Sequence, residues 1–241
     1  MRLKSVLLCL STVAALTSNA ADAIPLITNG NFELTTNGTN KQLSATPNNV
    51  ANRTTLAGWT SSNGNDGGYN FALDTRIIAT NASALALKAY TSTTDHGTVF
   101  ASDELYHPGT LSQRINGLDA GSAYTLTFDY ALGQQAGFNG KNTDNYWKVD
   151  FGTVTQNSAL LSIPSGGFSG WQTATMTFMA SSTSQVLSFL ARGSAAGAPP
   201  FLLLDNVSMT AAVPEPSTLS LMLGGVGLVG FLARRRRKTR A

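Results

Sequence analysis

Tyr124-Thr-Leu-Thr-Phe-Asp-Tyr130 is the stretch of this 241-residue chain that decides the fold. Its apolar residues alternate with polar ones, so that one face of an extended strand carries Tyr124, Leu126, Phe128 and Tyr130. The two threonines and Asp129 fall on the opposite face. A period of two with a single apolar face predicts an antiparallel strand that covers a core on one side only.

The same alternation recurs further along the chain. Ala174, Met176 and Phe178 alternate with threonines, and other strands are predicted over residues 146–151, 186–190 and 201–209. Asn, Asp and Gly separate the strands and predict turns, and the polar residues 35–70 predict long loops. No stretch of residues 24–212 keeps a helical period over three turns. The sequence therefore predicts an all-β domain, an antiparallel two-sheet β-sandwich, plausibly of the jelly-roll kind.

The first 23 residues have the pattern of a secretory signal peptide. Arg2 and Lys4 precede an apolar stretch over residues 6–16, and Ala21-Asp-Ala23 offers a small-x-small cleavage site. Cys9, the only cysteine of the chain, lies within that apolar stretch. Cleavage after Ala23 would leave a protein without thiols, which excludes disulfides, thiol nucleophiles and thiolate metal sites.

The last 29 residues, 213–241, form a second segment of unusual composition. Val213-Pro-Glu-Pro216 is followed by an uncharged apolar stretch, for which we predict a transmembrane helix over about residues 217–233. The basic cluster Arg234, Arg235, Arg236 and Arg237 comes directly after it and predicts a cytoplasmic C-terminus. The alternative for this segment is a buried core helix with a basic tail. With a signal peptide at 1–23 and a sorting segment at 213–241, the exported domain comprises residues 24–212.

Charge is distributed unevenly between the terminal segments and the domain. Eight of the 16 basic residues and two of the 13 acidic residues lie in the two terminal segments, which leaves residues 24–212 with a formal charge of −3. The high isoelectric point of the whole chain, about 9.1, thus comes from its termini. It gives no reason to expect a nucleic-acid partner.

The C-terminal segment resembles the PEP-CTERM sorting signal of Gram-negative bacteria. The resemblance rests on three parts in the same order: Pro214, Glu215 and Pro216, then a glycine-rich apolar stretch, then the arginine cluster. It implies that an exosortase in the inner membrane recognises the Pro-Glu-Pro motif and processes the chain nearby. The chain would be held in the inner membrane briefly and then reach the cell surface or the medium.

The domain itself is similar to galactose-binding-domain-like sandwiches, which include many carbohydrate-binding modules. Three segments carry the similarity: 26–33, 111–128 and 201–208. In several such modules an opening Glu and a closing Asp hold a structural calcium, and those positions here are Glu33 and Asp205. Two carboxylates suit a cation that prefers oxygen ligands. The alternative is that Glu33 caps a turn and that Asp205 accepts backbone N–H groups.

Carbohydrate binding would depend on exposed aromatic side chains, because sugar rings stack on them through their C–H faces. We predict a ligand-binding surface at Trp59, Tyr106 and Trp147, which lie beside polar or glycine-rich sequence. Burial in the core is the alternative for each of them. Trp171 is predicted to begin a core strand.

No arrangement of residues predicts catalysis. His96 and His107 lie near Asp95, Asp103 and Glu104, but their spacing matches no common metal motif. Asp103 and Glu104 are adjacent, so on a strand they would point to opposite faces. The sequence therefore predicts a non-enzymatic protein that binds exopolysaccharide or another glycan. A structural or adhesive matrix protein without a specific small ligand is the alternative.

Overall fold

The computed structural model describes residues 25–64, 66–92, 94, 96–194 and 199–212. These residues form strands, turns and loops, with no helix among them, and so none that could cross a membrane. The signal peptide predicted for residues 1–23 lies outside the described part, as do the Pro-Glu-Pro motif and the helix predicted over about 217–233. The all-β prediction for the exported domain is confirmed.

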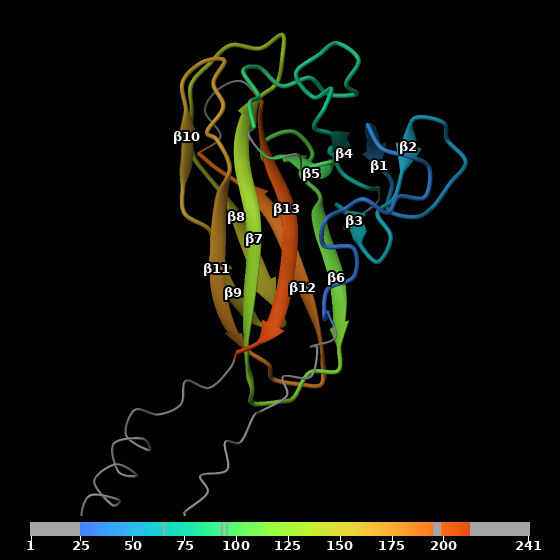
Figure 1. Ribbon diagram of the computed structural model, residues 1–241, viewed down its shortest axis with the longest axis vertical. Helices are drawn as coiled ribbons and strands as arrows, with labels where there is room; N and C mark the ends of the chain where they lie inside the picture. Colours follow the sequence, from blue (N-terminus) through green and yellow to red (C-terminus); the bar gives the residue numbers. More distant parts are fainter. Residues whose placement is uncertain (1–24, 65, 93, 95, 195–198, 213–241) are drawn as a thin grey trace, which may run out of the picture.

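Two sheets pack face to face as a β-sandwich. In Figure 1 the long strands β7 and β13 run side by side at the front, and β8 and β12 lie behind them. The front sheet has seven strands in the order β11 (Gln172–Met179), β7 (Ala123–Gln134), β13 (Pro200–Ala211), β5 (Thr98–Asp103), β4 (Asn70–Asp74), β1 (Lys41–Leu43) and β2 (Arg53–Thr54). Adjacent strands of this sheet are antiparallel, apart from the short parallel pair β1 and β2.

The back sheet has six antiparallel strands. Its order is β10 (Leu161–Ile163), β8 (Asn142–Phe151), β12 (Ser184–Arg192), β6 (Thr110–Asn116) and β3 (Thr60–Ser62), with β9 (Val154–Asn157) paired to β8. The stretch predicted as long loops over 35–70 thus contains the short strands β1, β2 and β3, which have too few residues to show a period of two in the sequence.

Strand β7 shows why the alternating residues form this sandwich. Tyr124, Leu126, Phe128 and Tyr130 are buried between the sheets, and the intervening polar side chains are partly exposed on the outer face, as predicted. From Ala131 onward both faces of β7 are buried. The outer face of the front sheet is therefore covered at one end and open at the other.

The covered end contains a second, smaller apolar cluster. Between the two sheets lies the main core, which includes Phe32, Phe100, Phe128, Trp147 and Phe189. The second cluster lies on the outer face of the front sheet, where the chain between β4 and β5 and the chain before β11 pack over it. Its members include Phe71, Leu73, Ile78, Leu87, Val99, Phe201 and Leu203, with Tyr69, Tyr90, Phe168 and Trp171 at its margin. The candidate functional site lies at the margin of this outer cluster, beside Trp171.

Candidate functional site

A β-bulge in β13 produces the centre of the candidate site. The pairing of β13 with β7 shifts register between Asp205 and Ser208, and Asn206 has a φ of 50°, which asparagine tolerates better than most residues. Asp205 lies directly across from Asp129 of β7. The Asn206 amide donates to Asp129 Oδ2 at 2.9 Å, so the bulge is fixed to the neighbouring strand.

His96 lies against the buried carboxylate of Asp205. Its Nδ1 is 2.9 Å from Asp205 Oδ2, and the two side chains are only 5% and 2% exposed. Burial raises the pKa of Asp205 to about 6, although the hydrogen bond with His96 opposes this shift. Oδ1 of Asp205 is buried and has no hydrogen-bond partner among the described residues. The site therefore holds a buried carboxyl group whose pKa is raised above its usual range.

Trp171 forms an aromatic wall beside His96. The two rings stack with centroids 4.0 Å apart and an interplanar angle of 21°. The indole N–H of Trp171 donates to the Tyr90 hydroxyl at 3.3 Å, which fixes the orientation of the ring. Trp171 directly precedes β11 and packs, half-buried, at the margin of the outer cluster, so the predicted start of a strand is one residue early and the residue lies outside the main core.

Glu33 reaches the same region from the start of the domain. Its Oε1 accepts the backbone N–H of Thr98 at 2.6 Å, and its Oε2 accepts the Thr98 hydroxyl at 3.2 Å. Gly97 permits this approach, since its φ is +57° and a Cβ there would lie 2.0 Å from Glu33 Oε1. The backbone N–H of Val207 donates to Gly30 O at 2.9 Å, so the opening and closing segments of the domain are neighbours.

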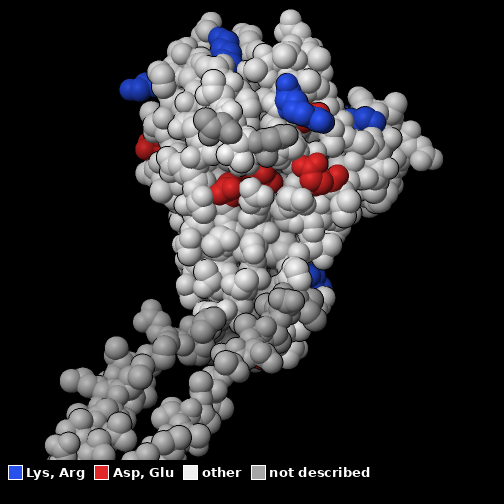
Figure 2. Space-filling view, in the orientation of Figure 1, with Lys and Arg blue, Asp and Glu red and all other residues white. Residues whose placement is uncertain are grey.

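Two adjoining hollows that share His96 form what we call the sheet-face groove. One has a volume of about 410 Å³ and is lined by Thr91, Ser92, Thr94, His96, Gly170 and Trp171. The other has a volume of about 390 Å³ and is lined by Asn31, Glu33, Arg76, His96, Gly97, Asp205 and Asn206. Each lies within the range of about 300–1,000 Å³ that is usual for ligand sites. Figure 2 shows acidic side chains gathered near mid-height on this face of the molecule.

A row of hydroxyl groups continues from the sheet-face groove along the open end of the front sheet. Thr173 Oγ1 donates to Asp129 Oδ1 at 2.6 Å, and Thr175 lies directly across from Thr127 on the same outer face. The groove is thus bordered by an aromatic wall at one side and by carboxylate, amide and hydroxyl groups at the other.

The structure corrects two of the three aromatic residues predicted to bind ligand. Trp59 and Trp147 are 6% and 0% exposed and belong to the main core, where their indole N–H groups donate to Asn29 O and Leu203 O. The burial of Trp147 follows from the alternation of side chains in β8, where it shares the inward face with Val149 and Phe151. Tyr106 is 66% exposed, as predicted, and its ring packs edge-on against Tyr69 with centroids 5.3 Å apart.

The two predicted calcium ligands lie in one groove, but they do not complete a calcium shell. Both oxygens of Glu33 are bonded to Thr98, and Oδ2 of Asp205 is bonded to His96. Calcium takes about six to eight oxygen ligands. Across the described part of the chain, no three His, Cys, Asp or Glu residues are grouped so as to hold a metal. The calcium site stays a prediction, for which Oδ1 of Asp205 is the available donor.

His107 and Asp103 are separate from the groove. His107 Nε2 lies 3.1 Å from Asp66 on a different part of the surface. Asp103 is fully buried, and its Oδ1 accepts the backbone N–H of Leu105 at 2.8 Å. Burial raises the pKa of the Asp103 carboxyl. Neither Asp103 nor His107 lines the sheet-face groove.

Sequence reasoning did not assign His96 and Trp171 to a ligand groove, nor Asp129 to a position beside it. In the sequence, Asp129 is only a polar residue on the outer face of the strand predicted over 124–130. Its place beside Asp205 depends on the register of β7 and β13. His96 and Trp171 come from irregular segments that have no sequence period. The pairing of β13 with β7 and the stacking of His96 on Trp171 both depend on tertiary contacts that no local pattern shows.

Comparison with known proteins identifies the C-terminal segment. Residues 212–237 match the family model described as the PEP-CTERM protein-sorting motif. The match begins at Ala212, one residue after β13 ends at Ala211. This motif implies an exported protein that is sorted through a membrane-anchored C-terminus. No curated protein matches the chain.

Solved structures similar to this chain include several carbohydrate-binding modules. One is TmCBM61 in complex with β-1,4-galactotriose, with 14% identity, coverage of 79% of this chain and 100% of that one, and a TM-score of 0.44. A second is described as "CBM4 structure and function", with 14% identity, coverage of 77% and 99%, and a TM-score of 0.33. A third is the CBM22-1 xylan-binding domain of Paenibacillus barcinonensis Xyn10C, with 11% identity, coverage of 65% and 87%, and a TM-score of 0.33.

Proposed function

We propose that the exported domain is a non-catalytic module that binds a glycan chain in the sheet-face groove. The observation that carries this proposal is the pair of adjoining hollows on either side of His96, one walled by Trp171 and the other by Glu33, Asp205 and Asn206. Two linked hollows suit a ligand built from linked rings. Carbohydrate is the class that combines such a chain with both apolar and hydroxyl surfaces.

The chemistry of the groove fits sugar rings. A sugar presents C–H groups on its faces, which pack on an aromatic ring, and hydroxyls at its edges, which bond to planar polar side chains. Trp171 supplies the ring, and Asn31, Asn206 and Arg76 supply planar polar groups. Because Trp171 is fixed by its bond to Tyr90, its ordering adds little cost on binding.

A binding role without turnover agrees with how the carboxylates are held. Glycoside hydrolysis uses an acid and a base or nucleophile that face each other across the scissile bond. Glu33, in the groove, is bonded to Thr98, and Asp129, beside the groove, is bonded to both Thr173 and Asn206. Side chains that already accept hydrogen bonds from the protein are suited to maintaining the shape of a site.

We expect replacement of Trp171 by alanine to weaken glycan binding at least tenfold, or about 1.4 kcal/mol, because the groove would lose its aromatic wall. The test is titration of residues 24–212 with exopolysaccharide purified from the host, by calorimetry or affinity electrophoresis. Tyr146→Ala is the matched control, since Tyr146 is a half-buried aromatic residue of β8 in the other sheet. Equal affinity for wild type and Trp171→Ala would place binding elsewhere.

Two further outcomes of this titration are informative. Repeating it with calcium and then with a chelator tests the predicted site at Glu33 and Asp205, because affinity that falls on chelation and returns with calcium requires a bound cation. If the folded domain binds no glycan in either condition, the protein is instead a structural or adhesive component of the matrix.

We further propose that an exosortase processes the chain near Pro214, Glu215 and Pro216 while residues 217–233 hold it in the inner membrane. The match over 212–237 supports this order of events, with Arg234–Arg237 retained on the cytoplasmic side. The intact mass of the protein recovered from the surface or medium of its host should then lack residues 234–241. Recovery of a surface form that retains them would rule out processing at the motif.

A further inference from the structure

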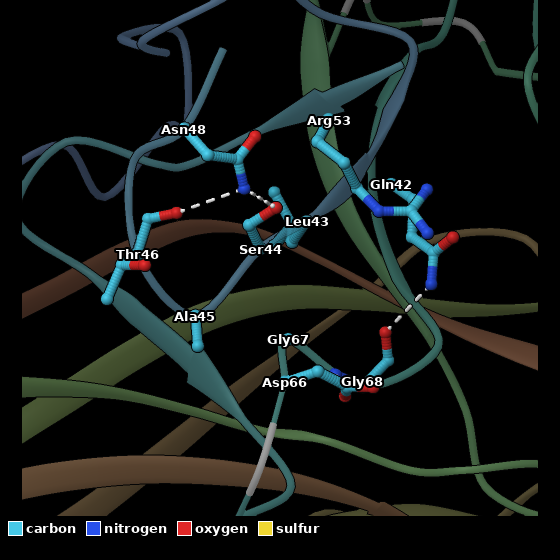
Figure 3. A pocket seen from close by; sticks show the side chains of 10 residues that line it. All are labelled: Gln42, Leu43, Ser44, Ala45, Thr46, Asn48, Arg53, Asp66, Gly67 and Gly68. Carbon is cyan, nitrogen blue, oxygen red and sulfur yellow. Dashed lines mark hydrogen bonds between the residues drawn. The ribbon is translucent and has the colours of Figure 1, made fainter. Parts of the chain in front are cut away.

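A second pocket lies away from the sheet-face groove, at the side of the molecule formed by β1 and β2. It has a volume of about 210 Å³, below the usual range of about 300–1,000 Å³, and so has room for little more than one ring. Figure 3 shows two walls that face each other across it, with Arg53 and Gln42 on one side and Ser44, Thr46 and Asn48 on the other. Asp66, Gly67 and Gly68 form its base.

The base of this pocket requires glycine. A Cβ on Gly67 would lie 2.4 Å from Leu43 O, and one on Gly68 would lie 2.6 Å from the Gly109 Cα. Gly68 also has a φ of +73°. Both glycines are buried, and the absence of side chains keeps the hollow open while the chains below it pack closely.

Most polar groups around the pocket are held by bonds to the protein. Gln42 Nε2 donates to Gly68 O at 3.1 Å, and Asn48 Nδ2 donates to Ser44 Oγ at 2.8 Å. Asp66 Oδ1 accepts the backbone N–H of Gly68 at 2.7 Å. That bond, together with one from His107, lowers the pKa of Asp66, so its carboxylate is ionised at neutral pH.

Arg53 differs from these groups. It follows the turn after Asn48 and is half-buried, yet its guanidinium makes no hydrogen bond or ion pair with any other described residue. In Figure 3 it extends alongside Gln42 over the pocket. A guanidinium presents a planar fork of donors that matches a carboxylate bidentately. The charge of Arg53 also contributes to the lowered pKa of Asp66. The pocket therefore offers a guanidinium that makes no hydrogen bond with the described residues and a carboxylate that is held by the Gly68 N–H.

From this arrangement we propose that the pocket binds a single sugar acid unit, such as a hexuronate. The sugar carboxylate binds the Arg53 guanidinium, and the ring hydroxyls donate to Asp66 and bond to the Ser44 and Asn48 side chains. The inference rests on the proposed function only in taking a glycan as the ligand. It assigns acidic sugars to this pocket, because the sheet-face groove is lined by two carboxyl groups, those of Glu33 and Asp205, and by only one guanidinium, that of Arg76.

The test is an NMR titration of ¹⁵N-labelled residues 24–212, which contain both sheets and both apolar clusters. The probes are sodium methyl glucuronide, neutral methyl glucoside, acetate and glycine, at equal ionic strength. We expect the glucuronide alone to saturate shifts of the Asp66, Gly67 and Gly68 amides. Equal shifts with glucoside would remove the role of the carboxylate, equal shifts with acetate would indicate an adventitious anion only, and stronger shifts with glycine would indicate an amino-acid site.

Variants separate this pocket from the groove. Arg53→Gln should weaken glucuronide binding at least tenfold and Asp66→Asn to a smaller extent. Arg114→Gln, on the exposed outer face of β6, should leave it unchanged. Trp171→Ala should also leave it unchanged, so loss of the groove and loss of the pocket are distinguishable. Unaltered binding in a folded Arg53→Gln variant would overturn the proposal.

Discussion

Replacement of Trp147 by alanine is expected to destabilise the domain by about 3–5 kcal/mol, a large part of the roughly 5–15 kcal/mol of a typical fold. Trp147 is fully buried between the sheets, and its ring lies 5.7 Å from that of Phe100 and 6.2 Å from that of Phe189. The change would leave a cavity there. It would also remove the hydrogen bond from the indole N–H to Leu203 O.

Urea unfolding of residues 24–212 measures this effect. Tyr106→Ala is the appropriate control, because Tyr106 was predicted from sequence to have the same role as Trp147 but is exposed. We expect it to change the free energy of unfolding by no more than about 0.5 kcal/mol. Similar losses in both variants would contradict the assignment of one residue to the core and the other to the surface.

The second large effect concerns Asp205 and pH. Its pKa is raised from 3.8 to about 6, chiefly by burial. A carboxyl whose pKa is higher in the folded than in the unfolded state stabilises the fold fully below the lower value. That stabilisation is lost as the pH rises through the higher one. For Asp205 the full change amounts to roughly 3 kcal/mol, most of it between about pH 4 and pH 7.

Asp205→Asn should remove this dependence while keeping the shape of the side chain. We expect the variant and the wild type to differ most above pH 6, where the variant gains in relative stability, and to converge near pH 4. His96, Glu33, Asp129 and Arg76 surround the position and remain in both proteins. A difference in unfolding free energy that stays constant from pH 4 to pH 7.5 would contradict an Asp205 pKa near 6.

Asp74→Asn is the control for this measurement. Its hydrogen bond with Arg76 lowers the pKa of Asp74, so its contribution has the opposite sign and is lost as the pH falls. The two variants should therefore change the slope of stability against pH in opposite directions. The effect at Asp74 should be the smaller, because its partner Arg76 is well exposed to solvent.

The strands that pair over long distances could be predicted because their residues alternate. Tyr124 to Tyr130 and Ala174 to Phe178 each present one apolar face, and they lie in register as neighbours in the front sheet. The same reasoning applied to β8 would have placed Trp147 inward with Val149 and Phe151. Trp147 was predicted to be exposed because its sequence neighbours are polar. Its position in the alternating pattern of the strand, in step with Val149 and Phe151, indicates burial instead.

The outer cluster and the groove beside it could not be predicted in the same way. The chain between β4 and β5 has no period, so its packing over Phe71 and Leu73 depends on tertiary contacts. The resemblance paired Glu33 with Asp205 as calcium ligands; both residues line one hollow, and the calcium itself stays a prediction. The stacking of His96 on Trp171 unites two irregular segments 75 residues apart, and no local pattern encodes it.

The measurement that tests the central proposal most directly is an NMR map of the binding surface on residues 24–212. Oligosaccharides released from the host exopolysaccharide would be titrated into the labelled domain. The account predicts saturable shifts at the β13 bulge, at residues 96–98 and at residues 170–173, with the outer face of β8 and β12 unchanged. Shifts confined to that opposite face, or none from a folded domain, would contradict glycan binding in the sheet-face groove.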